Sequence, residues 1–170
     1  MQRAFSFLLF SIAILSTIEA RAQRAVVHLA YGPYGSKGDA LYMVENGAIH
    51  QACGTFGAKG ACLYVIDGMQ VYRSADGFCS RGEGAFTIED NGLYRCRGTF
   101  CQKGQCVFVI EGNKIFWGDG PFCNKGEAAF VIEGKTVFLA EGAFARKGEA
   151  VLLIEGDLPM AALLAILAMI

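Results

Sequence analysis

Hydrophobic and polar positions repeat with a period of 22 residues along most of the chain. An aromatic residue recurs at this spacing, and a cation followed by glycine stands three positions after each one. The aromatic positions are Tyr34, Phe56, Phe78, Phe100, Phe122 and Phe144. The cations are Lys37, Lys59, Arg81, Lys103, Lys125 and Lys147. Six in-phase copies without a gap indicate a tandem repeat of one short unit.

Each unit predicts two β-strands joined by a tight turn. The first is an apolar run of about six residues, such as 105–110, rich in β-branched and aromatic side chains. A turn signal such as Asn46-Gly47 follows, and then a shorter run such as 115–117. Because both connections are short, neighbouring strands are expected to be antiparallel. Residues 26–29 fit the second strand of a preceding half unit.

The first strand of each unit is apolar on both of its faces. In residues 106–110, alternate side chains point to opposite sides, and none of them is charged or strongly polar. A strand with one wet face would instead alternate apolar and polar residues. We therefore expect both faces to be covered. The repeats form either two packed layers, as in a sandwich, or one open layer that associates with itself.

Two geometries satisfy the repeat: a meander of antiparallel hairpins and a β-solenoid. An acid follows the last apolar residue of each first strand. The acids are Glu45, Asp67, Glu89, Glu111, Glu133 and Glu155. A solenoid would stack these acids, and likewise the cations, into close ladders, and like charges directly opposite destabilise paired strands. The sequence thus predicts an all-β meander of 22-residue hairpin repeats, with the solenoid as the alternative.

Two elements of the unit resemble a known family of hairpin repeats. Gly98-Thr99-Phe100 and Gly120-Pro121-Phe122 are similar to the Gly-x-aromatic element of the MORN family, whose tandem repeats have a similar length. The resemblance implies a hairpin array. The Lys-Gly before the first strand and the Ile-Glu-Gly after it depart from the MORN pattern, so no function is carried over.

The N-terminal residues 1–22 have the layout of a secretory signal peptide. Arg3 precedes an apolar run over residues 4–18, and Ala20 and Ala22 form a small-x-small cleavage site. The run is short for a membrane anchor, which needs ~20 apolar residues. We therefore expect a secreted, periplasmic or cell-envelope protein whose repeats occupy residues 23–157. Residues 23–170 carry a net charge of −2 without a basic patch, which argues against a nucleic-acid partner.

Residues 158–170 break the repeat and form an uncharged, strongly apolar run. Repeat arrays need a cap over their terminal unit, and Pro159 suits a terminal position. We predict that this segment caps the end of the array. The alternative is an apolar tail with weak membrane association, because a run of ~10–14 apolar residues is more often buried or interfacial than spanning.

Seven cysteines, all in residues 23–170, are candidates for disulfides in an exported chain. They are Cys53, Cys62, Cys79, Cys96, Cys101, Cys106 and Cys123. Because seven is odd, complete internal pairing leaves one thiol that is free or links two chains. Stacked solenoid coils would allow Cys79–Cys101 or Cys101–Cys123, since a disulfide needs Cα atoms about 4.4–6.8 Å apart. Hairpins instead favour Cys96–Cys101 or Cys101–Cys106.

The residue pattern contains no recognisable catalytic, metal or cofactor motif. The cysteine spacings match neither zinc sites nor a Cys-x-x-Cys redox pair. His28 and His50 occupy the aromatic column of the second strands, which predicts a packing role. Almost every polar residue is a repeated one, whereas catalysis needs a unique constellation. We therefore predict a protein that is not an enzyme and uses no cofactor.

A binding surface is best sought where residues vary on the regular scaffold. Arg95 and Trp117, beside the aromatic column of the second strands, are two such residues. We predict an exported, non-enzymatic β-repeat scaffold that binds an unknown protein or glycan partner or forms part of the cell envelope. A self-assembling fibre or matrix protein, and hence a homo-oligomer, is the first alternative. A thiol-redox or metal-binding protein is the second.

Overall fold

The computed structural model describes residues 24–54, 56–98, 100–120 and 122–170, and the predicted signal peptide lies outside these ranges. The described chain forms twelve β-strands followed by one helix, α1 (Met160–Leu167). The strands are β1 (Arg24–Tyr31), β2 (Ser36–Glu45), β3 (Ala48–Cys53), β4 (Ala58–Asp67), β5 (Gln70–Ser74), β6 (Arg81–Glu89), β7 (Gly92–Arg97), β8 (Gln102–Glu111), β9 (Lys114–Asp119), β10 (Asn124–Glu133), β11 (Thr136–Glu141) and β12 (Arg146–Gly156). The predicted all-β fold of two-strand repeats is confirmed.

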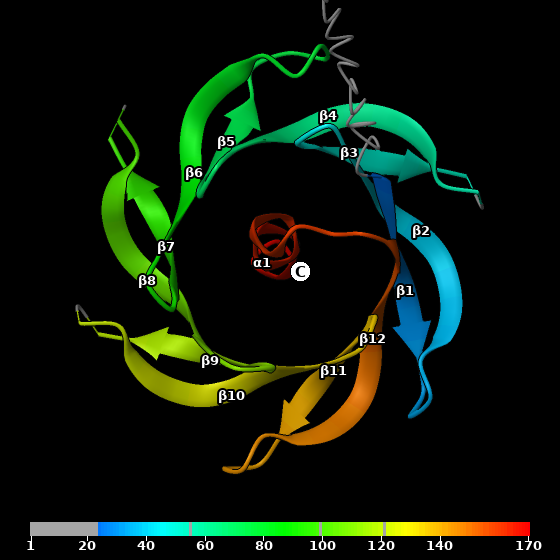
Figure 1. Cartoon of the computed structure of the whole chain (residues 1–170), viewed down its shortest axis with the longest axis vertical. Helices are drawn as coiled ribbons and strands as arrows, with labels where there is room; N and C mark the ends of the chain where they lie inside the picture. The colour runs from blue at the N-terminus through cyan, green and yellow to red at the C-terminus, as the bar shows by residue number, and fades with distance from the viewer. Residues whose placement is uncertain (1–23, 55, 99, 121) are drawn as a thin grey trace, which may run out of the picture.

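The strands form an antiparallel meander that closes into a barrel (Figure 1). Each strand pairs with its neighbours in sequence, and β1 closes the ring by pairing with β12 from Ala25 opposite Gly156 to Leu29 opposite Leu152. β1 is the strand of the preceding half unit, so it supplies the twelfth strand that the sixth repeat lacks. The hairpin meander is therefore correct, and the solenoid alternative is not.

The lumen of the barrel is filled by α1, seen end-on at the centre of Figure 1. Its residues Ala161–Leu167 are all buried and belong to the same core cluster as Val27, Leu93 and Phe108 of the wall. A barrel of about eight strands is filled by its own side chains, and wider barrels enclose additional space. Twelve strands leave room for one helix, which here completes the core.

The covering of the apolar strands thus differs from what the sequence led us to expect. The inner face packs on α1, and neither a second sheet layer nor a second molecule is needed to bury it. The segment 158–170, expected as a terminal cap or an apolar tail, supplies this helix. A helix that is hydrophobic all round is stable only when it is buried on all sides. Closure also leaves the array without a terminal unit to cap.

The even-numbered strands are longer than predicted and bend outward. β8 spans Gln102–Glu111 because the Lys-Gly that we expected in a connection lies within the strand. Its pairing with β7 shifts register on both sides of Tyr94, and the other odd–even pairs show equivalent shifts. Such bulges bend a strand and increase its twist. The outer part of each odd–even hairpin therefore splays away from the barrel axis (Figure 1).

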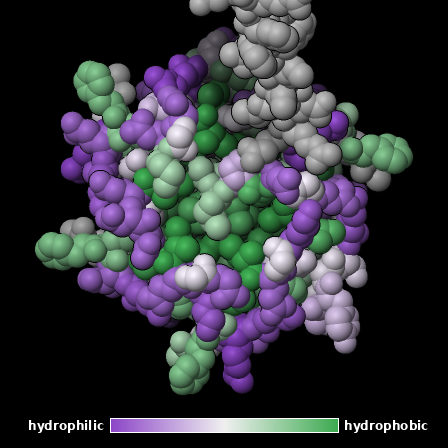
Figure 2. Space-filling view, viewed as in Figure 1, coloured by the Kyte–Doolittle hydropathy of each residue, from purple (hydrophilic) through white to green (hydrophobic). Residues whose placement is uncertain are grey.

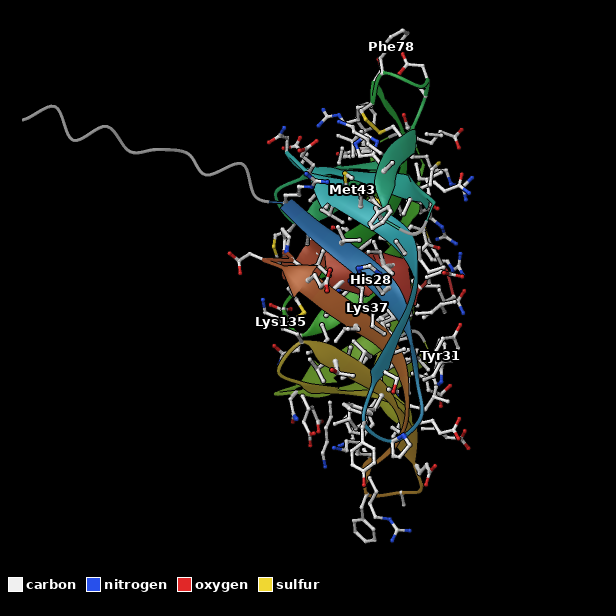
Figure 3. The ribbon with its side chains drawn as sticks, turned by 90° about the vertical axis from the view of Figure 1, so that its right-hand side faces the viewer. His28, Tyr31, Lys37, Met43, Phe78 and Lys135 are labelled. Carbon is white, nitrogen blue, oxygen red and sulfur yellow. A yellow bond between two sulfur atoms is a disulfide. The ribbon has the colours of Figure 1, made fainter. Side chains whose placement is uncertain are left out.

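We call these six splayed hairpins petals 1 to 6 in chain order, from β1–β2 to β11–β12, and their turns the tips. Figure 3 shows Phe78 at the tip of petal 3, far from the barrel wall. The same view places Tyr31 and Lys135 at opposite ends of the barrel. We call the end toward which the petals extend the petal end, and the end with the even-to-odd turns the turn end.

The repeated charges lie between petals on the outer face, in pairs of opposite sign. Each cation bonds to the acid of the preceding repeat, and the last acid bonds to the first cation across the closure. The pairs are Lys37–Glu155, Lys59–Glu45, Arg81–Asp67, Lys103–Glu89, Lys125–Glu111 and Lys147–Glu133. Four cations also cover a buried aromatic ring, as Lys125 does at 4.0 Å from the centroid of Phe116. The outer apolar face is thereby shielded from water.

Candidate functional site

The tips present six aromatic side chains to solvent. Each is between 84% and 95% exposed, in contrast to the other repeated aromatics, most of which are buried or half-buried. The tip residues are Tyr34, Phe56, Phe78, Phe100, Phe122 and Phe144. Figure 2 shows hydrophobic groups projecting separately from the edge of the molecule, with hydrophilic groups between them and the centre. Interaction surfaces are usually marked by contiguous apolar patches, and these separate groups do not form one within the molecule.

The residue after each tip aromatic has the same backbone conformation in every petal and links neighbouring petals in two places. Its φ is positive in all six petals, from 49° to 70°, a conformation that glycine adopts freely at Gly35 and Gly57. Petals 3, 4 and 5 have cysteine at this position, and its side chain faces the preceding petal. In two of these petals a disulfide makes the link. In petal 4 the facing residue is Gly84, and Cys101 bonds within its own petal instead.

Six of the seven cysteines form disulfides: Cys62–Cys79, Cys96–Cys101 and Cys106–Cys123. The pairing Cys96–Cys101 is one that hairpins favoured, whereas Cys101–Cys106 and the two solenoid pairings do not form. The other two disulfides join neighbouring petals and have Cα separations of 5.4 and 5.2 Å. Cys53 is exposed and is the one described cysteine with a free thiol.

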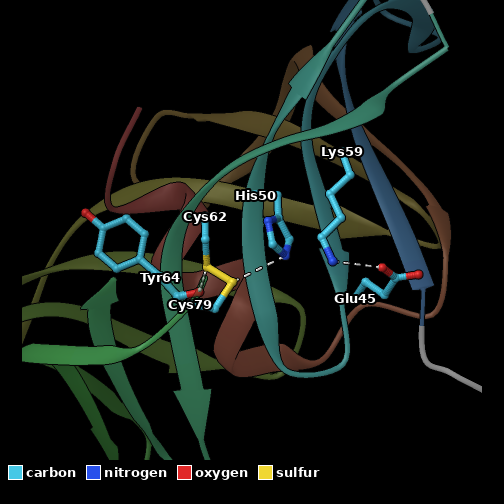
Figure 4. Close-up of polar contacts among 6 residues, drawn as sticks. All are labelled: Glu45, His50, Lys59, Cys62, Tyr64 and Cys79. Atoms are coloured by element: carbon cyan, nitrogen blue, oxygen red, sulfur yellow. Dashed lines mark hydrogen bonds and ion pairs between the residues drawn. A yellow bond between two sulfur atoms is a disulfide. The ribbon is translucent and has the colours of Figure 1, made fainter. Parts of the chain in front are cut away.

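The two histidines lie in the outer aromatic column and are buried. His28 Nε2 is 3.1 Å from Glu155, and His50 Nε2 is 3.7 Å from Cys79 Sγ (Figure 4). Burial lowers the pKa of His50, and the charge of Lys59 lowers it further. Within the described residues, His50, Cys62 and Cys79 form a cluster of potential metal ligands. Since both sulfur atoms belong to a disulfide, the cluster offers one imidazole and no thiolate.

The lumen face of the odd strands carries two rings of side chains, two residues apart. The inner ring packs on α1 and consists of Val27, Ile49, Val71, Leu93, Ile115 and Val137. The next ring toward the petal end, which we call the mouth ring, consists of Leu29, Gln51, Arg73, Arg95, Trp117 and Leu139. Every inner-ring residue is apolar and fully buried, whereas the mouth ring is mixed in chemistry and its residues are half-buried or exposed.

An apolar groove lies inside the mouth ring, between α1 and the barrel wall. It encloses about 440 Å³, and its lining is mostly aliphatic and aromatic. Leu29, Trp117 and Leu139 of the mouth ring line it, and Leu167 and Ile170 close it on the helix side. The volume is in the range of small-molecule sites, about 300–1,000 Å³.

Trp117 packs against the aromatic wall of this groove. Its ring centroid is 4.9 Å from that of Phe108 and 6.4 Å from that of Phe130, and nearly half of its surface remains exposed. Farther round the mouth ring, Arg73 pairs in register with Tyr64 on the neighbouring strand β4, and Arg95 with Phe86 on β6. Neither arginine forms an ion pair within the described part of the chain.

The structure brings both predicted surface residues, Arg95 and Trp117, into the mouth ring. Arg73 and Leu139 occupy equivalent positions two strands away on either side, and the 22-residue register would have found them. The contribution of Ile170 is different, because no pattern in the repeat places the C-terminal segment inside the barrel. The mouth ring and its groove are therefore our candidate functional site.

A closed barrel of six hairpin repeats around one helix is a structural type of fold rather than a catalytic one. Residues 31–167 match the family described as 6-fold beta flower protein, and the chain belongs to this family. No curated protein and no solved structure matches the chain. The three disulfides are more typical of an extracellular or periplasmic protein than of a cytosolic one. Among the described residues, no helix has the length and hydrophobicity to cross a membrane.

Proposed function

We propose that the protein is an exported, non-enzymatic scaffold that binds a small apolar ligand in its mouth ring, in the cell envelope or outside the cell. The observation that carries this proposal is the groove of about 440 Å³ lined by Leu29, Trp117 and Leu139. A pocket of this kind, largely apolar with a few polar groups at its edge, is the usual form of a small-molecule site.

The assignment of the charged residues supports a binding role without catalysis. The repeated acids and cations are engaged in ion pairs on the outer face, away from the groove. The polar members of the mouth ring are Gln51, Arg73 and Arg95, a set without the side chains that usually act as nucleophile or general base. One of the disulfides that join petals, Cys106–Cys123, ties the β9–β10 part of the groove wall to β8, and such a link is stable outside the cell.

Trp117 is the only tryptophan in the chain, so its fluorescence reports on the groove directly. We expect N-phenyl-naphthylamine, a neutral apolar probe, to bind saturably with one molecule per chain and to quench this fluorescence. Leu139→Arg places a charge in the groove and should weaken the binding by roughly tenfold or more, since burying an unpaired charge costs several kcal/mol. Non-saturable quenching that Leu139→Arg leaves unchanged would show that the groove is not a binding site.

Self-assembly is the second candidate function, and the six exposed tip aromatics favour it. Closure of the barrel removes the sheet edges through which a fibre would usually grow, so contacts between copies would have to involve the tips. We expect such contacts to raise the mass measured by light scattering as concentration increases. Replacing Phe56, Phe100 and Phe144 by serine should abolish that rise. A wild-type mass equal to one chain at all concentrations would eliminate this candidate.

A further inference from the structure

We propose that the ligand of the mouth ring is a free single-chain anionic amphiphile, with an alkyl chain in the groove and a carboxylate against Arg73 and Arg95. This inference rests on the proposed function and specifies its ligand. It follows from the uneven distribution of side chains around one ring of an otherwise regular barrel.

The apolar half of the ring accounts for the alkyl chain. Trp117 on β9 and Leu139 on β11 are both more than 40% exposed. They lie on the lumen face of the sheet, and the inner-ring residues on the same face pack on α1. With Ile170, Trp117 and Leu139 leave an apolar wall in contact with water. A bound alkyl chain would remove this surface from water, which is favourable in proportion to the apolar area that is buried.

The cationic half accounts for the headgroup. Arg73 and Arg95 are both exposed, and they lie two strands apart on the same face. Neighbouring strands are spaced by about 4.8 Å, so the backbones of Arg73 and Arg95, two strands apart, are separated by roughly 10 Å. Arg95 and Trp117 are also two strands apart and have the same backbone separation. Long arginine side chains span such a gap and bind a carboxylate through paired N–H donors. The ion pairs that occupy the repeated cations elsewhere do not involve these two residues.

The position of the groove favours a free molecule over a membrane surface. The groove lies inside the barrel mouth and is bounded by β1, β2, β9 to β12 and the end of α1. The petals surround it and point away from the axis (Figure 1). A single alkyl chain is narrow enough to enter such a recess. A bilayer presents a broad surface, which the surrounding petals would keep away from the recessed wall. We therefore assign the site to a dissolved amphiphile.

The test compares decanoate with decanol and decyltrimethylammonium, three probes that share one alkyl chain and differ in charge. Decanoate and decyltrimethylammonium are titrated below their micellar concentrations, and decanol below its solubility limit, while Trp117 fluorescence is recorded, with calorimetry as a second readout. We expect decanoate to bind at least tenfold more tightly than decanol and the cationic probe to bind least tightly, since hydrogen bonds to a charged group raise affinity by about tenfold or more.

Variants separate the headgroup contact from general electrostatic attraction. Arg73→Gln and Arg95→Gln should each weaken decanoate several-fold and leave decanol unchanged. Lys135→Gln, in a turn at the opposite end of the barrel, removes the same charge and should change neither affinity. Equal affinities for decanoate and decanol, or equal effects of all three variants, would overturn the anionic ligand while leaving an apolar site. Absence of saturable binding by all three probes would overturn both proposals.

Discussion

The inner ring and the mouth ring lie on the same face of the same six strands, two residues apart, and yet their chemistry differs. All six inner-ring residues are aliphatic and fully buried against α1. At the level of the mouth ring, α1 has ended, and the six equivalent positions hold three apolar residues, two arginines and one glutamine. Where the helix fills the lumen, all six repeats need an aliphatic side chain at the equivalent position. Where the helix has ended, the side chains of the repeats are free to differ.

The comparison identifies which variation carries information. In a repeat protein, residues that pack against the same neighbour at every step are constrained alike. A mixture of Trp117, Leu139, Arg73 and Arg95 at one level is then a property of this chain rather than of its fold. The groove between the mouth ring and the end of α1 is where the six repeats differ most in chemistry.

The largest effect is expected from a charge on the helix side of the inner ring. Leu164 is fully buried at the centre of α1, so Leu164→Asp would place an unpaired carboxylate in the lumen. We expect a loss of at least ~4 kcal/mol in the free energy of unfolding, enough to prevent folding. Met160→Asp is the matched control, since Met160 is half exposed at the start of α1, where a negative charge is favourable. Urea unfolding of a Leu164→Asp protein as stable as wild type would show that α1 does not fill the barrel.

The two rings are compared directly by removing the same side chain from each. Leu93 in the inner ring has no exposed surface, whereas Leu139 in the mouth ring is 44% exposed. Leu93→Ala should lower the free energy of unfolding by ~2–5 kcal/mol through lost burial and a cavity. Leu139→Ala should cost about 1 kcal/mol or less and should weaken the apolar probe instead. Equal losses of stability at both positions, measured by urea unfolding, would remove the distinction between the rings.

The same comparison shows how far the sequence alone leads. The 22-residue period is sufficient to predict the two-strand units and the equivalence of Arg95 and Trp117, because these depend on local pattern. Predicting the meander requires a further consideration, the repulsion between like charges that a solenoid would stack. The period does not predict closure, which depends on bulges such as those around Tyr94 that accumulate over twelve strands. Two-sided apolar strands show that both faces are covered without showing by what. For residues 158–170 the pattern indicates burial, but the partner is a lumen that exists only after closure.

A smaller effect on stability, with a large effect on binding, is expected when the mouth ring is made chemically like the inner ring. The double variant Arg73→Leu/Arg95→Leu replaces exposed cations that form no ion pairs with described residues. We expect the free energy of unfolding to change by about 0.5 kcal/mol or less per site. Decanoate affinity should fall to that of decanol. A loss of more than about 3 kcal/mol in thermal or urea unfolding would mean that the arginines support the fold.

The smallest effect on stability is expected from His50, on the outer face of the same strands. We predict that it contributes a pH dependence of the free energy of unfolding that involves neither ring. Burial and Lys59 lower the pKa of His50 in the folded protein, whereas the unfolded chain binds the proton with a pKa near ~6.5. The unfolded state therefore takes up more protons as the pH falls through ~6.5, and the free energy of unfolding declines below that pH and is unaffected above it.

His50→Tyr places at this position the residue that Tyr94 supplies two repeats later, so the variant should show a shallower decline between pH 7 and pH 5. The double variant Arg73→Leu/Arg95→Leu leaves His50 and Lys59 in place, so it should keep the wild-type slope. Parallel slopes for wild type and His50→Tyr would show that His50 is protonated equally in both states.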